Sequence, residues 1–296
     1  MALSSILNLS DNPIAKAEYR HQRFLITNSR SGIGWILLAV GMLAPAFLTS
    51  LYYVGTRFTN SQQISPFFDV QFGSIWEQLL GVGTLFMLTM NVALYLVVIL
   101  ITVALASNSI SREKRSKTWD TLLLTNIDSR KIVMGKWWAS LRSIWGDHSM
   151  LVILRLGLVG YALNIANPTA PEGFTVVTAY VLPLMIASIL FTLVDAMFSC
   201  ALGVTLPLSP LSGAITGGIG LFVKLATVFA SGGAFLYAML LIRNQNGFDY
   251  LLLIAGALLA YGLVTWVMLY LAQYIAIRGQ VSSPAKSEQK ITPLGR

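Results

Sequence analysis

The stretch SNSISREKRSKTWDTLLLTNIDSRKIVMGKWWASLR, residues 107–142, determines how we interpret the rest of this chain. It concentrates basic residues between two long apolar runs, 79–106 and 149–166. Its charges are costly to place in lipid. One face of the segment is nevertheless too apolar to remain in water. That face comprises Trp119, Leu122, Leu123 and Ile127. We therefore expect an aqueous segment that joins two membrane spans and docks its apolar face on another surface.

The composition is that of a membrane protein. Hydrophobic residues make up 55% of the chain and charged residues 11%, with a mean hydropathy of +0.70, whereas soluble domains carry about 25% charged residues. Six apolar runs reach the length of about 20 residues that crosses a bilayer: 33–55, 79–106, 149–166, 174–206, 213–242 and 250–277. Because lipid offers the backbone no hydrogen-bond partners, these spans should be helices. We predict one all-α integral membrane domain over residues 1–296, with six transmembrane helices.

The distribution of Lys and Arg sets the expected orientation. These residues gather before the first span, in the segment 107–142 and after the last span, whereas Arg57 and Arg243 alone fall on the opposite side. The positive-inside rule then places both termini and the segment 107–142 in the cytosol. The net charge of +8 is accordingly a topology signal, and we expect the basic residues to face a membrane surface rather than nucleic acid.

The two ends of the chain have different predicted roles. Asn12-Pro13 suggests a helix cap followed by Pro at the first helical position. The following residues mix charged and apolar side chains, so we interpret 12–30 as an interfacial helix in contact with lipid on the inner leaflet. A disordered basic tail is the alternative. Residues 279–296 are expected to form a flexible tail. Between the first two spans, the aromatic-rich residues 56–78 are expected to form an interfacial segment or a short helix.

Three ionisable residues fall within predicted spans: Arg155, Asp195 and Lys224. Spans four and five turn near Ser209-Pro210, and equal spacing from that turn puts Asp195 and Lys224 at the same depth. Arg155 enters from the same side to a similar depth. We predict a charge cluster in which Asp195 pairs with Lys224, with Arg155, or with both. Such a cluster is either a structural ion pair that holds spans three, four and five together, or a functional group that lines a substrate route or couples transport to protons.

Several catalytic patterns are missing from the sequence. Gly135-Lys136 is followed by Trp137 and lacks the upstream Gly of a phosphate-binding loop, and neither H-E-x-x-H nor G-x-S-x-G occurs. The two histidines, His21 and His148, have no metal-ligand spacing around them. We therefore expect no catalytic residue, no metal site and no cofactor in this chain.

The pattern in 107–142 resembles the first cytosolic loop of type-2 ABC exporter permeases. That loop carries the signature R-E-x-x-x-x-T-x-[DE]-x-L-L-x-T followed by I-V-x-G-K, between spans two and three. Here it is matched by Arg112-Glu113, by Thr118-Trp119-Asp120-Thr121-Leu122-Leu123-Leu124-Thr125 and by Ile132-Val133-Met134-Gly135-Lys136. The opening Asn12-Pro13-Ile14, with Glu18 and Arg20, also resembles the interfacial helix of that family.

The resemblance implies a permease subunit of an ATP-driven exporter, in a bacterial or archaeal plasma membrane. A second permease copy or paralogue and two cytosolic ABC ATPase subunits would be its partners, with ATP and Mg²⁺ bound by the ATPases. A coupling helix between spans two and three would dock on an ATPase, and the turn 207–212 would make a smaller contact. The implied coupling residues are Arg112, Glu113, Thr118, Trp119, Asp120, Leu122 and Leu123.

Two other classes of function stay open. An ion-gradient-driven secondary transporter would use Asp195, although the span lengths show no inverted repeat. A non-transporting membrane scaffold is the third class. The last outward loop, 243–249, is too short for the re-entrant helices of the lipid- and drug-exporting branch of the resembled family, so that branch offers no guide to the substrate.

Overall fold

All regular structure in the described part of the chain is helical. The computed structural model describes residues 11–29, 41, 44, 66–124, 127–166, 182–209, 213–243 and 249–288. The helices are α2 (Pro13–Ser29), α4 (Pro66–Arg115), α5 (Thr118–Leu124), α6 (Ser129–Ser143), α7 (Trp145–Ala166), α9 (Leu182–Thr205), the 3-10 helix η4 (Leu206–Leu208), α10 (Gly213–Arg243) and α11 (Asp249–Glu288). The prediction of an all-α fold is therefore confirmed. The predicted first span, 33–55, lies almost wholly outside the described residues.

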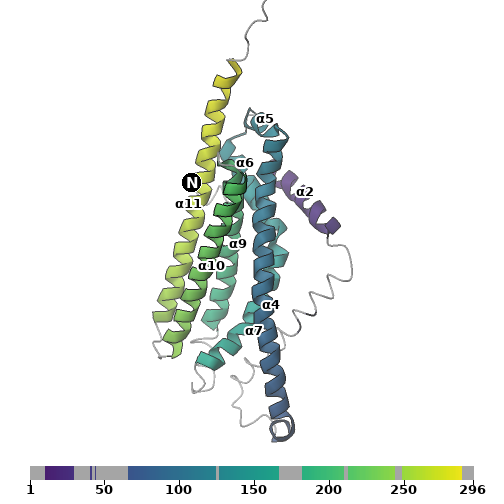
Figure 1. The fold of residues 1–296 in the computed structure, drawn as a ribbon, viewed down its shortest axis with the longest axis vertical. Helices are drawn as coiled ribbons and strands as arrows, with labels where there is room; N and C mark the ends of the chain where they lie inside the picture. The colour runs from purple at the N-terminus through teal and green to yellow at the C-terminus, as the bar shows by residue number, and fades with distance from the viewer. Residues whose placement is uncertain are drawn as a thin grey trace, which may run out of the picture.

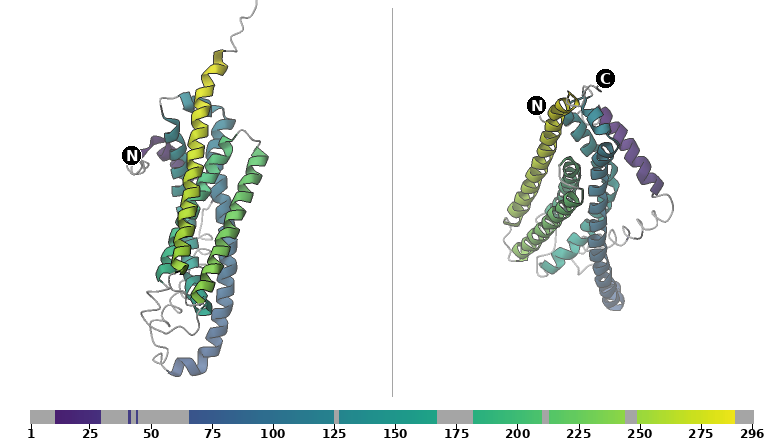
Figure 2. Two further views of the ribbon diagram at one scale, coloured as in Figure 1. Left: turned by 90° about the vertical axis from the view of Figure 1, so that its left-hand side faces the viewer. Right: turned by 45° about the horizontal axis from the view of Figure 1, so that its top comes forward.

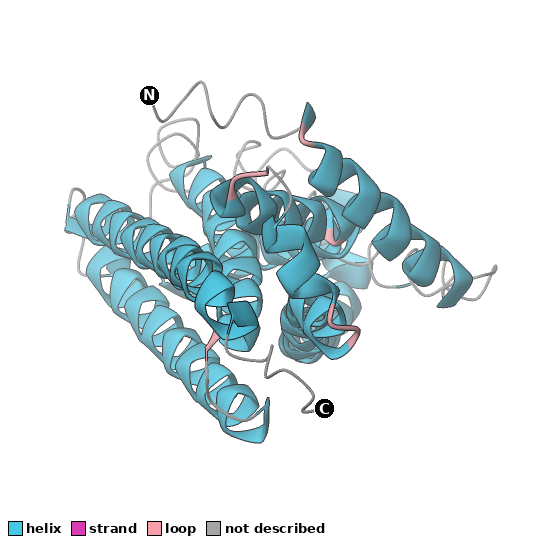
Figure 3. Ribbon diagram, turned by 90° about the horizontal axis from the view of Figure 1, so that it is seen from above, coloured by secondary structure: helices cyan, strands magenta, loops and turns pink. Residues whose placement is uncertain are grey.

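The long helices form an elongated bundle. In Figure 1, α4, α9, α10 and α11 run along the long axis, and α7 is inclined to them. The short helices α5 and α6 lie near one end of this bundle, and α2 lies beside it at that end (Figures 1 and 2). Figure 3 shows the same arrangement from above, with α2 separate from the long helices. The segment 107–142 and α2 therefore meet at one end of the molecule.

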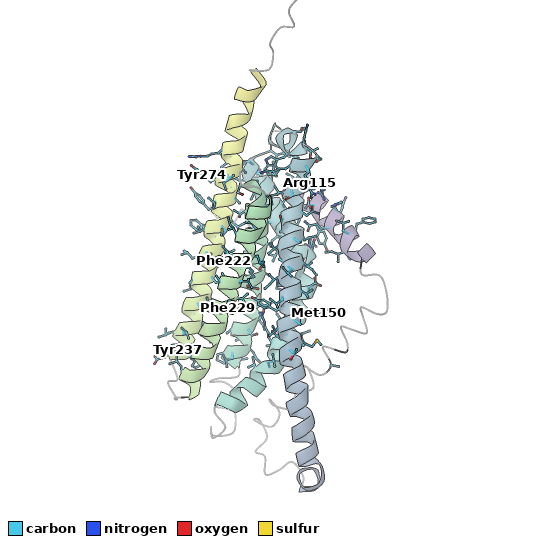
Figure 4. All side chains as sticks on the ribbon, in the orientation of Figure 1. Arg115, Met150, Phe222, Phe229, Tyr237 and Tyr274 are labelled. Atoms are coloured by element: carbon cyan, nitrogen blue, oxygen red, sulfur yellow. The ribbon has the colours of Figure 1, made fainter. Side chains whose placement is uncertain are left out.

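Within the part of the chain that the structure describes, three helical stretches are long and apolar enough to cross a membrane: Thr89–Arg115, Leu182–Leu208 and Asp249–Arg278. A shorter apolar stretch, Gly218–Ala234, lies in α10. These stretches are compatible with a membrane protein, while six as the number of spans stays a prediction. In the most apolar stretch of α11 only 6% of the residues are buried, whereas 44% are buried in the corresponding stretch of α9. Large apolar side chains such as Phe222 and Phe229 on α10 point outward (Figure 4), as expected for a surface that contacts lipid or another apolar partner.

Two predicted boundaries differ from the structure. Residues 66–78 continue into α4 rather than forming a separate interfacial segment. Residues 279–288, predicted as part of a flexible tail, extend α11 to Glu288, while 289–296 lie outside the described residues. Both differences have the same physical basis, because lengthening an existing helix adds a hydrogen bond per residue without a new nucleation step.

Local sequence signals explain how α2, α5 and α6 begin. The Asn12 side chain accepts a hydrogen bond from the Ile14 backbone N–H at 3.0 Å, so the predicted cap is present. Asp128 caps α6 in the same way and accepts a hydrogen bond from the Arg130 N–H at 3.0 Å. Between α4 and α5, Lys117 adopts a φ of 57°. This left-handed residue turns the chain sharply and lets α5 pack back on the bundle.

The main apolar core lies at the end of the bundle that carries α5 and α6. It joins residues of α4, α5, α6, α9 and α11, including Ile110, Trp119, Ile132, Val204 and Ala272. Close contact between α4 and α9 depends on Gly203. A Cβ at this position would lie 2.6 Å from the Ala106 Cβ and 2.8 Å from the Val103 carbonyl oxygen. The absence of a side chain at Gly203 therefore sets the distance between these two helices.

We predict that Gly203→Val separates α4 from α9 and destabilises the protein by about 1–3 kcal/mol, the usual result of overpacking. Gly218→Val is the matched control, because a Cβ at Gly218 meets nothing within 4 Å. Thermal unfolding of the two purified variants in detergent provides the comparison. Equal midpoints for both variants would contradict the assigned role of Gly203.

Candidate functional site

A buried network of charged side chains joins α2, α4 and α6. At its centre, Lys136 of α6 lies between two carboxylates, with its Nζ 3.1 Å from Glu18 Oε2 and 3.4 Å from Glu113 Oε1. The ammonium also donates to the Ser109 carbonyl oxygen at 2.8 Å. The Lys136 and Glu18 side chains are only 2% and 4% exposed. Each buried charge thus has partners of opposite sign, as burial requires.

Arg112 completes the network from the end of α4. Its guanidinium lies 3.1 Å from Glu18 Oε2 and 3.5 Å from Glu113 Oε1, and its side chain is 35% exposed. Two cations therefore face two carboxylates, and the four side chains balance in charge. Because the members come from three helices, the network fixes α2 and α6 against the end of α4.

Neutral contacts extend the same interface between α2 and α6. Gln22 donates to Glu18 Oε1 and to Ser140 Oγ, both at 3.1 Å, and Asn12 Nδ2 donates to the Lys131 carbonyl oxygen at 2.7 Å. Gly135 allows this close approach, because a Cβ there would lie 2.8 Å from Asn12 Nδ2. The cap of α2 therefore also serves as its attachment to α6.

Glu113 connects the network to α5. The Thr118 hydroxyl, in the first residue of α5, donates to Glu113 Oε2. The Thr118 hydrogen bond and the positive charges of Lys136 and Arg112 all favour the ionised form of the Glu113 carboxyl. Glu113 thus holds the start of α5 against α4 and α6.

We predict that Lys136→Met destabilises the protein by roughly 3 kcal/mol, because it strands buried carboxylates that keep only Arg112 as a cationic partner. For a chain of this size the unfolding midpoint should fall by roughly 5–10 °C. The exposed Lys131→Met is the control and should have little effect. Glu18→Gln in the Lys136→Met background should recover part of the loss, and no difference between Lys136→Met and Lys131→Met would rule out the network as a source of stability.

The structure changes the interpretation of the apolar face of 107–142. Trp119 is 7% exposed and belongs to the apolar core, with Leu122 and Ile127 packed against that core. The expected docking of this face is thus met for Trp119 by the apolar core of the same chain, while a contact between Trp119 and an ATPase stays a prediction. The side chains of Asp120 and Leu123 lie outside the described residues.

The exposed residues among the described side chains of α5 are polar. Thr118 and Thr121 are exposed, as are Lys114, Arg115 and Lys117 in the preceding turn. Lys114 Nζ donates to the Pro207 carbonyl oxygen in η4, so the two segments predicted to contact a partner lie together. Arg115, at the end of α4, and Tyr274, on α11, mark this end of the bundle in Figure 4.

A second group of polar side chains lies inside the bundle. Lys224 of α10 forms an ion pair with Asp195 of α9, and both side chains are at most 3% exposed. Tyr261 of α11 donates to the same Asp195 oxygen and accepts from Lys224 Nζ at 3.2 Å. The structure therefore brings two of the three predicted intramembrane charges together and adds a tyrosine from a third helix.

Arg155 has different partners. Its guanidinium donates to the Thr192 hydroxyl at 2.6 Å and lies over the rings of Tyr95 and Phe191, 4.7 Å and 5.3 Å from their centroids. Stacking on aromatic faces stabilises a guanidinium that is partly removed from water. Arg155 thus joins α7 to α4 and α9 beside the Asp195–Lys224 pair.

We predict that Asp195→Asn lowers the yield of folded protein, because it leaves the Lys224 ammonium buried without its carboxylate. Asp195→Asn with Lys224→Met removes both charges and should restore much of the yield. The measurement is the amount of monodisperse protein after extraction in mild detergent. If Asp195→Asn folds as well as the wild type, the ion pair does not stabilise the fold. The transport activity of the Asp195→Asn variant would then be the quantity to measure.

The sequence alone gave little indication of the roles of three residues in these two sites: Glu18, Lys136 and Tyr261. Glu18 and Lys136 appear in the matched motifs, but only the structure identifies them as the buried centre of a network. The sequence did contain one indication that Lys136 is buried. Lys136 lies at helical spacing from Ile132, Val133 and Ser140, which are all buried on the same helix. Tyr261 had no comparable signal, since a single hydroxyl in an apolar run is compatible with many positions.

We compared the chain with protein-family models, with curated proteins and with solved structures, and none of them matches it.

Proposed function

We propose that this chain is the membrane-spanning permease subunit of an ATP-driven exporter of the type-2 ABC class. One observation carries the proposal: the two segments that resemble this family, 12–30 and 107–142, are far apart in sequence but form one polar network. Glu18 from the first segment contacts Arg112 and Lys136 from the second. The residues behind the resemblance are therefore part of one interface.

The network gives α5 a mechanical connection to the long helices. Glu113 holds Thr118 at the start of α5, Trp119 packs in the core with residues of α9 and α11, and Trp137 Nε1 donates to the Met197 carbonyl oxygen of α9 at 3.1 Å. A force applied to α5 by a cytosolic ATPase would reach these helices directly. ATP and Mg²⁺ would bind to that ATPase, and a second permease copy or paralogue would complete the substrate route.

The buried Trp119 changes how the contact should be tested. Replacement of Trp119 would disturb the core, so its effect on a partner could not be separated from misfolding. Thr121 is exposed on α5 and is a suitable position for a bulky charge. Ala17, exposed on α2 and outside the proposed contact, is a matched position for the same substitution.

We predict that a cytosolic ATPase with a phosphate-binding loop co-purifies with the tagged chain from its native membrane in mild detergent. Thr121→Arg should reduce the recovered ATPase activity at least about tenfold, equivalent to roughly 1.4 kcal/mol of binding free energy, whereas Ala17→Arg should leave it unchanged. Equal recovery with both variants would exclude α5 as the contact.

An ion-gradient-driven carrier is the second candidate, favoured by the buried Asp195, Lys224 and Tyr261. Ionisable groups within membrane spans often belong to transport pathways. A chain that elutes without an ATPase and still moves solute into vesicles under an ion gradient would support this candidate over the permease. A chain that neither retains an ATPase nor moves solute would support the third class, a non-transporting membrane scaffold.

A further inference from the structure

A basic cavity lies between α2 and α6. Its volume is about 480 Å³, within the range of small-molecule sites. Four cationic side chains line it, three from α2 and one from α6: Lys16, Arg20, Arg23 and Arg142. No carboxylate is among the described residues of the lining, although Lys16 also pairs with the exposed Asp11 at 3.2 Å. The cavity therefore favours an anionic ligand.

The cations are supported by aromatic residues of the same cavity. The Arg142 guanidinium lies over the Tyr19 ring, 4.6 Å from its centroid, and Arg23 approaches the Tyr19 hydroxyl at 3.5 Å. Small side chains at Ala15 and Ala139 leave space between the helices. In the neighbouring network, the Glu18 carboxylate is held by Arg112 and Lys136.

Apolar side chains identify the kind of anion. Phe24 lines the cavity beside the arginines and is 67% exposed, and the adjacent Leu25 is 42% exposed. Cationic and large apolar side chains together on one helix are typical of the boundary between lipid headgroups and acyl chains. A free inorganic anion would gain nothing from Phe24, whereas a phospholipid satisfies both parts of the surface.

We propose that this cavity binds the phosphate headgroup of an anionic phospholipid, with Arg20, Arg23 and Arg142 around the phosphate and Phe24 against the start of the acyl chains. The proposal requires α2 to lie at the membrane surface but does not depend on an ATPase partner. Bound lipid would then attach α2 to the membrane on one side, while the buried network attaches it to α4 and α6 on the other.

The test is native mass spectrometry of the purified, delipidated chain with phosphatidylglycerol, phosphatidylcholine or inorganic phosphate added. The wild-type chain should retain phosphatidylglycerol in preference to phosphatidylcholine. Arg20→Gln with Arg142→Gln should weaken this binding at least about tenfold, since each cation near an anionic lipid contributes to affinity. Arg130→Gln with Lys131→Gln removes two exposed cations outside the cavity and should have no such effect.

A second variant separates binding from folding. Arg20→Gln with Arg23→Gln keeps the Arg142–Tyr19 contact and should show the same loss of phosphatidylglycerol. Equal retention of the two lipids, an equal loss in the control pair, or occupancy by inorganic phosphate with no preference for lipid would each overturn the proposal. None of these results requires the ATPase, so they are independent of the test of transport function.

Discussion

The buried ammonium of Lys136 is the constraint on which one end of this molecule depends. A charge at 2% exposure is tolerated only when nearby carboxylates and carbonyl groups replace the water that it has lost. Glu18, Glu113 and Ser109 supply these partners from two other helices. The positions of α2 and α4 relative to α6 therefore follow from the need to neutralise one side chain, and α5 follows through Glu113.

The two buried ion-pair sites differ in their access to water. The Lys136 network reaches the surface through Arg112, whose side chain is 35% exposed, so part of the network keeps its hydration. The Asp195–Lys224 pair is closed on all sides within the bundle and relies on Tyr261 to complete its hydrogen bonds. The first arrangement suits an interface that meets water, and the second suits a contact between helices surrounded by apolar residues.

The sequence predicted helix type and caps well, because these depend on neighbours in the chain. Asn12 and Asp128 each bond to a backbone N–H two residues later, and the apolar runs have a length that only a helix explains. It could not decide outcomes that depend on packing between distant segments. The apolar Trp119 side chain was predicted to dock on another surface, but which surface covers it depends on helices such as α9 and α11 that are far away in sequence. Lys224 could be paired with Asp195 from a symmetric turn, but Tyr261 could not be placed by any comparable rule.

The length of α11 has a mechanical consequence. Its 40 residues span about 60 Å at 1.5 Å per residue, against a hydrocarbon core of about 30 Å. In Figure 1 its upper end projects beyond α5. If the helix crosses the bilayer, a large part of it stands outside the hydrocarbon and acts as a lever with its fulcrum in the membrane. Rotation of such a lever by about 10° displaces one end relative to the other by about 10 Å, so a small angular change becomes a large movement at its tip.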